Sequence, residues 1–383
     1  MTSEPSKPSL PGGARILLVL TAVGFVSLGL PDGMLGVAWP SMRSEFGLAI
    51  DRIGGVLVTF MAGYLLSSVG SGTVLSRMGL GMLLASSALV TAVSLATYAM
   101  APGWWVVVAA GFLAGLGAGA VDAGLNAYVA LNHRPATMTW LHAAYGLGAA
   151  GSPVLLGELL AQGASWRTGY IWVAGVEIVL AAGFLATRAL WPGPASGGAS
   201  MLPRGATLVE VLGERRVWLG ILVFFLYTGL EWSFGTWCYT WLVSRKEFGP
   251  EAAGAWTGAF WGAVAGGRVL VGVLGTSVSP ARVVGLSAVV LLAGSALMLA
   301  DMGTVAALAG LLLTGLACAP MFPMLMAMTP ERVGAKRATQ VVGVQIAAAI
   351  LGQSLLPAVI GVAANAAGVR VIPWLWLALA VVY

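Results

Sequence analysis

The sequence predicts an all-α membrane protein with twelve transmembrane helices. Its 383 residues are 59% hydrophobic and only 9% charged, whereas about a quarter of the residues in a soluble domain are charged. The apolar residues form runs near the roughly 20 residues that a helix needs to cross a bilayer. One long polar break, 192–215, separates six of these runs from the other six. These three observations exclude a set of soluble domains.

The predicted spans follow from the apolar runs and the polar loops that punctuate them. We place them at 15–40, 52–75, 80–100, 103–131, 138–162, 168–191, 216–243, 251–274, 282–300, 303–328, 337–363 and 369–383. The last segment is short for a complete span.

The same boundaries give the predicted organisation of the chain. Residues 1–14 are polar and rich in Pro and Ser, as is typical of a disordered tail. A first six-helix bundle covers 15–191, a linker 192–215, and a second six-helix bundle 216–383.

Basic residues in the loops predict the orientation. Twelve of the nineteen Lys and Arg fall on the side of the N-terminus, six fall on the other side, and Arg268 lies inside 251–274. By the positive-inside rule, both termini lie in the cytoplasm and the chain is a multi-pass protein of the plasma membrane.

Short motifs recur in the two halves at an offset near 200 residues. Gly29-Leu30 precedes Asp32, and Gly229-Leu230 precedes Glu231. Gly148 and Pro153 recur with the same spacing as Gly352 and Pro357, and Gly70 and Gly79 as Gly266 and Gly275. Two related halves are typical of secondary transporters that rock around a central site.

Two aspartates lie deep inside predicted spans, Asp32 in 15–40 and Asp122 in 103–131. An acid at that depth is costly, so such residues usually face an internal cavity and have a function. Asn126 lies one turn after Asp122 and therefore on the same helical face. A carboxyl that alternates between dry and wet surroundings can bind and release a proton.

These residues resemble the major facilitator superfamily. Gly70–Gly79 is similar to its loop signature, although Ser76 replaces the usual acid. The motifs around Asp32, Gly115–Asn126 and Leu141–Gly148 are similar to the fucose-permease-like branch. The resemblance implies the major facilitator fold, a monomer, and a proton-coupled sugar symporter. It also implies that Asp32 and Asp122 handle the proton.

Further polar and aromatic side chains are predicted to bind substrate. An acid beside aromatic rings suits a sugar ring, which offers both C–H faces and hydroxyl groups, and it equally suits an organic cation. The predicted substrate-binding residues are Asn126, His142, Tyr145, Tyr227, Glu231, Trp232, Trp237 and Gln345. Arg268 is expected to pair with an acid or with backbone carbonyls.

Other classes of function find little support in the sequence. The ATP-binding motif G-x-x-x-x-G-K-[ST] is absent, and His133 and His142 lack metal-ligand spacing. We therefore expect no cofactor, no metal and no enzyme activity. Basic residues occur singly along the loops, so no nucleic acid is expected either. The predicted partners are a small polar solute, protons and the lipid bilayer. A proton-coupled sugar transporter is the first hypothesis, and a proton/drug or metabolite antiporter is the alternative.

Overall fold

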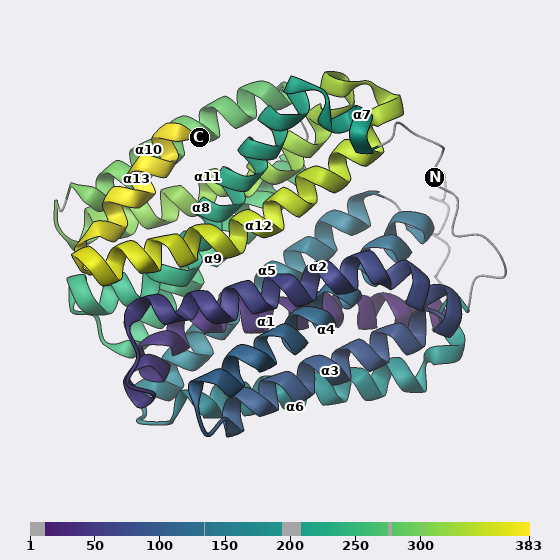
Figure 1. Cartoon of the computed structure of the whole chain (residues 1–383), viewed down its shortest axis with the longest axis horizontal. Coiled ribbons are helices and arrows are strands. Elements are labelled where there is room, and N and C mark those ends of the chain that lie inside the picture. The colour runs from purple at the N-terminus through teal and green to yellow at the C-terminus, as the bar shows by residue number, and fades with distance from the viewer. Residues whose placement is uncertain (1–11, 134, 194–207, 275–277, 301) are drawn as a thin grey trace, which may run out of the picture.

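Two six-helix bundles lie side by side in the computed structural model, which describes residues 12–133, 135–193, 208–274, 278–300 and 302–383 (Figure 1). The N-terminal bundle consists of α1 (Gly12–Glu45), α2 (Ile53–Met78), α3 (Leu80–Met100), α4 (Trp104–Asn132), α5 (Pro135–Ala161) and α6 (Trp166–Ala186). The C-terminal bundle consists of α8 (Arg215–Lys246), α9 (Pro250–Leu274), α10 (Pro280–Leu299), α11 (Thr304–Val333), α12 (Ala335–Ala367) and α13 (Ile372–Val382).

The predicted fold class is confirmed, and the helices begin and end within a few residues of the predicted spans. Ten of the described helices are long and apolar enough to cross a membrane, while Val369–Val382 forms a shorter apolar helix. Most of the predicted tail and linker, namely 1–11 and 194–207, lies outside the described residues. The end of the linker forms a short helix, α7 (Leu208–Leu212).

Several connections between helices are very short and depend on glycine. Gly79 alone separates α2 from α3, and Gly334 alone separates α11 from α12. Their φ angles are 76° and 82°, in a region that side-chain-bearing residues avoid and glycine adopts freely. These two residues therefore let the chain reverse between antiparallel helices without a loop.

Glycines also bring helices within each bundle into close contact. In α1, Gly29 and Gly33 lie against the backbone of α5, where an added Cβ would collide with the carbonyls of Tyr145 and Ala149. In α4, Gly115 and Gly119 lie in the same way against α2. Small residues at such crossings allow membrane helices to pack through their backbones. The pairs α1–α5 and α2–α4 therefore form the frame of the N-terminal bundle.

The two bundles meet at the end that carries the short helix η1 (Ile50–Arg52). There α5 packs on α9, and α2 and η1 pack on α12. A Cβ on Gly36 of α1 would lie 2.6 Å from the Thr236 carbonyl oxygen of α8. A Cβ on Gly157 of α5 would lie 2.9 Å from Gly254 Cα of α9. The backbones of the two bundles are therefore in close contact at this end.

Towards the opposite end, the ribbons of the two bundles lie farther apart (Figure 1). Gly70 of α2 and Gly343 of α12 have no neighbouring atom within 4 Å of a Cβ position. Figure 1 shows the two bundles diverging in this direction, towards the side that carries α7. The two bundles are therefore in close contact at one end of the molecule and farther apart at the other (Figure 1).

A candidate substrate cavity between the bundles

A cavity of about 230 Å³ lies between the two bundles, midway along the helices. The N-terminal bundle contributes acids and tyrosines from α1, α2, α4 and α5, and the C-terminal bundle contributes polar and aromatic residues from α8, α9 and α12. Its lining includes Asp32, Phe60, Tyr64, Asp122, His142, Tyr145, Thr228, Glu231, Trp232, Thr236, Trp261, Arg268, Gln353 and Ser354.

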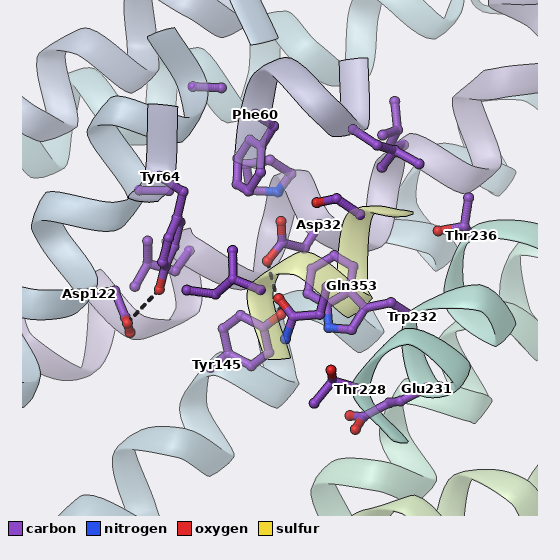
Figure 2. A pocket seen from close by; sticks show the side chains of 18 of the residues that line it. Asp32, Phe60, Tyr64, Asp122, Tyr145, Thr228, Glu231, Trp232, Thr236 and Gln353 are labelled. Atoms are coloured by element: carbon purple, nitrogen blue, oxygen red, sulfur yellow. Dashed lines mark hydrogen bonds between the residues drawn. The ribbon is translucent and has the colours of Figure 1, made fainter. Parts of the chain in front are cut away.

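Asp32 lies on α1 where that helix passes Pro31, and the helix continues through this residue without a break. The Tyr145 hydroxyl of α5 donates a hydrogen bond of 2.9 Å to Asp32 Oδ2 (Figure 2). A hydrogen bond to an ionised acceptor is stronger than one between neutral groups. Tyr145 therefore holds the Asp32 carboxyl at the cavity surface in a fixed orientation.

Asp122 lies on α4 and has two partners. The Tyr64 hydroxyl of α2 donates to Asp122 Oδ2 at 2.6 Å (Figure 2). The Asn126 amide donates to Asp122 Oδ1 at 2.8 Å and to the Asp122 backbone carbonyl at 2.9 Å. Within the described residues, no Lys or Arg side chain forms an ion pair with Asp32 or Asp122. Both acids therefore depend on neutral donors alone.

Glu231, on α8, is in a different electrostatic situation. Arg268 of α9 donates through Nη2 to Glu231 Oε1 at 3.1 Å, and Glu231 is almost fully buried. Tyr227 donates a short hydrogen bond to Glu231 Oε2. The expected partner of Arg268 is thus an acid across the helix interface. The positive and negative charges cancel in the C-terminal wall, which remains polar without a net charge.

The remaining C-terminal wall is a polar and aromatic stripe. Thr228, Trp232 and Thr236 follow one another at intervals of four residues on α8, so they share one helical face. The Trp232 ring meets the Trp261 ring edge to face at 5.7 Å. Gln353 and Ser354 of α12 complete this side of the cavity. Rings with a few hydroxyl and amide groups are typical of pockets for small polar solutes.

Six of the ten predicted site residues line the cavity, namely Asp32, Asp122, His142, Tyr145, Glu231 and Trp232. His142 also packs edge to face against Phe25 at 5.4 Å. Asn126 and Tyr227 lie one step behind the surface and hydrogen-bond Asp122 and Glu231. Their side chains contact the two acids, and the direct contact with substrate that we expected stays a prediction.

The structure does not bring Trp237 or Gln345 to the cavity. Trp237 lies five residues after Trp232, which turns it to about the opposite face of the helix. It is fully buried, and its indole donates to the Pro357 carbonyl at 2.9 Å. Gln345 is also buried and accepts a hydrogen bond of 2.9 Å from Thr329. These two residues therefore lie outside the cavity lining, and their contact with substrate stays a prediction.

One lining residue with a clear hydrogen-bond partner was not predicted, namely Tyr64. Tyr64 follows Phe60 by one turn on α2, and their rings lie 6.1 Å apart. In the sequence this pair resembles ordinary core packing. Its distinguishing feature is the acid that it meets on another helix, which only the tertiary structure reveals.

Within the described residues, no group of three His, Cys, Asp or Glu is placed to hold a metal ion.

Comparison with known proteins identifies a family. The family description Major Facilitator Superfamily matches residues 21–299. Bypass of stop codon protein 6 of Saccharomyces cerevisiae is 23% identical over 284 residues, which cover 67% of this chain and 56% of that protein. The glucose/mannose transporter GlcP of Bacillus subtilis is 22% identical over 354 residues, which cover 89% of this chain and 86% of GlcP. This chain thus spans little more than half the length of the yeast relative.

Solved structures show the same fold. The nucleoside transporter NupG, as a point mutant, superposes with a TM-score of 0.80 over 96% of this chain and 97% of that chain, at 13% identity. A bacterial homologue of the human lysosomal transporter Spinster, inward-facing and unoccupied, gives a TM-score of 0.72 over 94% of this chain and 84% of that chain, at 14% identity.

Proposed function

We propose that this chain, which belongs to the Major Facilitator Superfamily, is a proton-coupled secondary transporter of a small polar solute, with a sugar as the first candidate. Membership in the family makes it a membrane transporter and not an enzyme. The proton, the sugar and the direction of coupling are the proposed part.

One observation carries the proposal of proton coupling. Asp32 and Asp122 both line the cavity between the bundles and are held by neutral donors, whereas Glu231 is balanced by Arg268. An isolated carboxylate is costly in a low-dielectric cavity, and a proton removes that cost. Closure of the bundles around the solute therefore favours the protonated forms of Asp32 and Asp122. Opening of the cavity to an alkaline interior favours release of the two protons.

The cavity chemistry supports a neutral, hydroxyl-rich solute. Once Asp32 and Asp122 are protonated, no unbalanced charge remains among the described lining residues, because Arg268 and Glu231 compensate each other. Thr228, Thr236 and Gln353 offer hydrogen bonds, and Trp232 offers a ring face. The likeness to a glucose/mannose transporter over most of both chains supports the same class.

Alternating access then follows from the contacts between the bundles. With both termini in the cytoplasm, the closely packed end at η1 faces outwards and the end where the bundles lie farther apart faces the cytoplasm. The structure thus represents an inward-open state in this scheme. The opposite state requires the bundles to separate at Gly36 and Gly157 and to close around the ends of α2 and α12.

Uptake into proteoliposomes tests the proposal. Purified protein is reconstituted into vesicles with an interior more alkaline than the medium, and labelled glucose, mannose and related hexoses and polyols are added outside. We expect at least one of them to accumulate above its external concentration and to leave when an ionophore removes the gradient. Uptake of every solute that stops at equilibrium would contradict proton coupling.

The antiporter alternative rests on the same two acids, which would bind a cation once they are deprotonated. The same vesicles separate the two functions. An antiporter would expel a preloaded lipophilic cation when protons enter, and it would show no accumulation of hexoses.

A further inference from the structure

Asp32 and Asp122 belong to two structurally equivalent units of the N-terminal bundle, each an acid–tyrosine pair. In one unit, Tyr145 of α5 donates to Asp32 of α1. In the other, Tyr64 of α2 donates to Asp122 of α4. Each bundle of this fold is built from two three-helix repeats, so α1 corresponds to α4 and α2 corresponds to α5. The two acid–tyrosine pairs therefore occupy corresponding positions with the helices exchanged.

A glycine contact repeats in the same way. Gly29 lies three residues before Asp32, and a Cβ on it would collide with the Tyr145 carbonyl oxygen. Gly119 lies three residues before Asp122, and a Cβ on it would lie 2.5 Å from the Tyr64 carbonyl oxygen. In both units a glycine thus lets the acid-bearing helix approach the backbone of the tyrosine that hydrogen-bonds its acid. The agreement of the acid, the tyrosine and the glycine makes a chance resemblance between single hydrogen bonds a poor explanation.

From this arrangement we propose that Tyr64 and Tyr145 are equivalent positioning residues that stabilise the charged form of Asp122 and Asp32 respectively, so that the cavity holds two separately tuned proton sites. The inference rests on the proton coupling proposed above and adds a role for the tyrosines. Neither phenol needs to touch the solute, because each acts through its acid.

Other groups around the two acid–tyrosine pairs also influence their protons. Both acids line the same cavity. Asn126 is the second partner of Asp122, whereas Asp32 has no second donor among the described residues. The titratable and charged groups on the neighbouring helices are Tyr98 on α3, His142 on α5, Tyr170 and Glu177 on α6, Tyr227 and Glu231 on α8, and Arg268 on α9. On the cavity-lining part of α12, Gln353 and Ser354 are uncharged.

Removal of either phenol should shift the titration midpoint of its acid in a definite direction. A carboxylate that loses a donor is less stable in its charged form, so it keeps its proton to higher pH. A hydrogen bond to a charged group contributes enough to shift a titration midpoint by about one pH unit. We therefore expect Tyr145→Phe to raise the midpoint of Asp32 by about one unit, and Tyr64→Phe to raise that of Asp122 by a smaller amount, because Asn126 remains.

Isotope-edited infrared spectroscopy tests this without any solute. The chain has four aspartates, Asp32, Asp51, Asp122 and Asp301, and protein labelled with ¹³C at the aspartate carboxyl is titrated in lipid nanodiscs. Asp32→Asn and Asp122→Asn assign the two cavity bands. Tyr170→Phe is the matched control, because Tyr170 lines the same cavity and its hydroxyl has no hydrogen-bond partner in the part of the chain that the structure describes.

The expected result is that each Tyr→Phe variant shifts only the band of its own acid and that Tyr170→Phe shifts neither. In the Asp122→Asn background, Tyr64→Phe should leave the remaining titration unchanged. Unshifted bands in both variants would overturn the inference, as would a single band for the two acids or equal shifts of both bands. If either single variant unfolds, the other still decides between these results. Shifted bands without proton-driven uptake would reject the transport proposal and keep the role of the tyrosines.

Discussion

The Arg268 guanidinium donates to Glu231 at 3.1 Å across the interface between α9 and α8, with side-chain exposures of 20% and 5%. This ion pair balances the charges on the side of the cavity that the C-terminal bundle forms. The N-terminal bundle instead holds its two acids through tyrosines. The cavity therefore has a charge-balanced wall in the C-terminal bundle and, in the N-terminal bundle, the two acids for which we propose proton binding.

The ion pair makes a prediction about stability. Arg268→Gln leaves Glu231 buried without a counter-charge, and loss of one partner of a buried pair is strongly destabilising. Because Arg268 is partly exposed, we expect a loss of about 2 kcal/mol, below the range for a fully buried pair. Thermal unfolding in detergent measures the change. Glu231→Gln in the same protein should restore part of the loss, and a double variant no more stable than the Arg268→Gln protein would contradict the pairing.

The close contact of the bundles at the η1 end predicts that a larger side chain placed there slows transport. Gly157→Leu places a side chain against Gly254 of α9, and overpacking of this kind costs about 1–3 kcal/mol. The conformation in which this end is closed should become less populated by roughly 5-fold to 150-fold. We therefore expect hexose uptake to fall while the protein still folds.

Gly151→Leu is the control for this variant. Gly151 lies on the same helix, and its Cβ position has no neighbour within 4 Å. It should therefore transport at the rate of the unmodified protein. Equal uptake by the two variants would show that the contact between α5 and α9 does not gate transport.

Two glutamines of α12 should differ in function. Gln353 lines the cavity, where we propose that its amide hydrogen-bonds the solute. Gln353→Leu should therefore raise KM about fivefold. Gln345→Leu removes the partner of Thr329 in the packed interior and should lower the melting temperature with little change in KM. Uptake at a series of hexose concentrations measures the first effect, and a rise in KM for Gln345→Leu alone would contradict the placement of the cavity.

The proposed proton sites, Asp32 and Asp122, predict that their loss abolishes proton-driven accumulation of the solute but spares its exchange. Asp32→Asn and Asp122→Asn keep the shape of the side chains but remove the titratable group. We expect both variants to lose accumulation under a pH gradient while still exchanging labelled for unlabelled solute. Glu158→Gln is the control, because Glu158 bonds the exposed Gln162 and does not line the cavity. Normal accumulation by either Asp variant would remove that residue from the coupling.

Much of the fold was predictable because each span is an apolar run of nearly fixed length, which a sequence displays directly. The two acids were equally visible, since a carboxylate inside such a run stands out. Gln345 and Gln353 were not distinguishable in this way. Eight residues separate them by about 12 Å along the helix and rotate them by about 80°. Only the position of α12 between its neighbours determines which of the two faces the cavity.

Tyr64 is a second residue whose contact the sequence alone does not indicate. On α2 it is an aromatic residue near Phe60, and its chemistry depends on Asp122, which lies 58 residues away in the chain. The pairing of Arg268 with Glu231 similarly spans 37 residues. Single-residue signals predicted which groups are unusual, whereas their partners depend on how the helices pack.

External pH recorded beside proteoliposomes tests the central claim most directly. Vesicles in weakly buffered medium receive a hexose that the uptake assay has identified, with no pH gradient imposed and the membrane potential clamped. A proton-coupled symporter carries protons inwards with the solute, so the medium should become more alkaline, and the Asp32→Asn and Asp122→Asn proteins should give no signal. Acidification of the medium, or solute entry with no change in pH, would contradict the account.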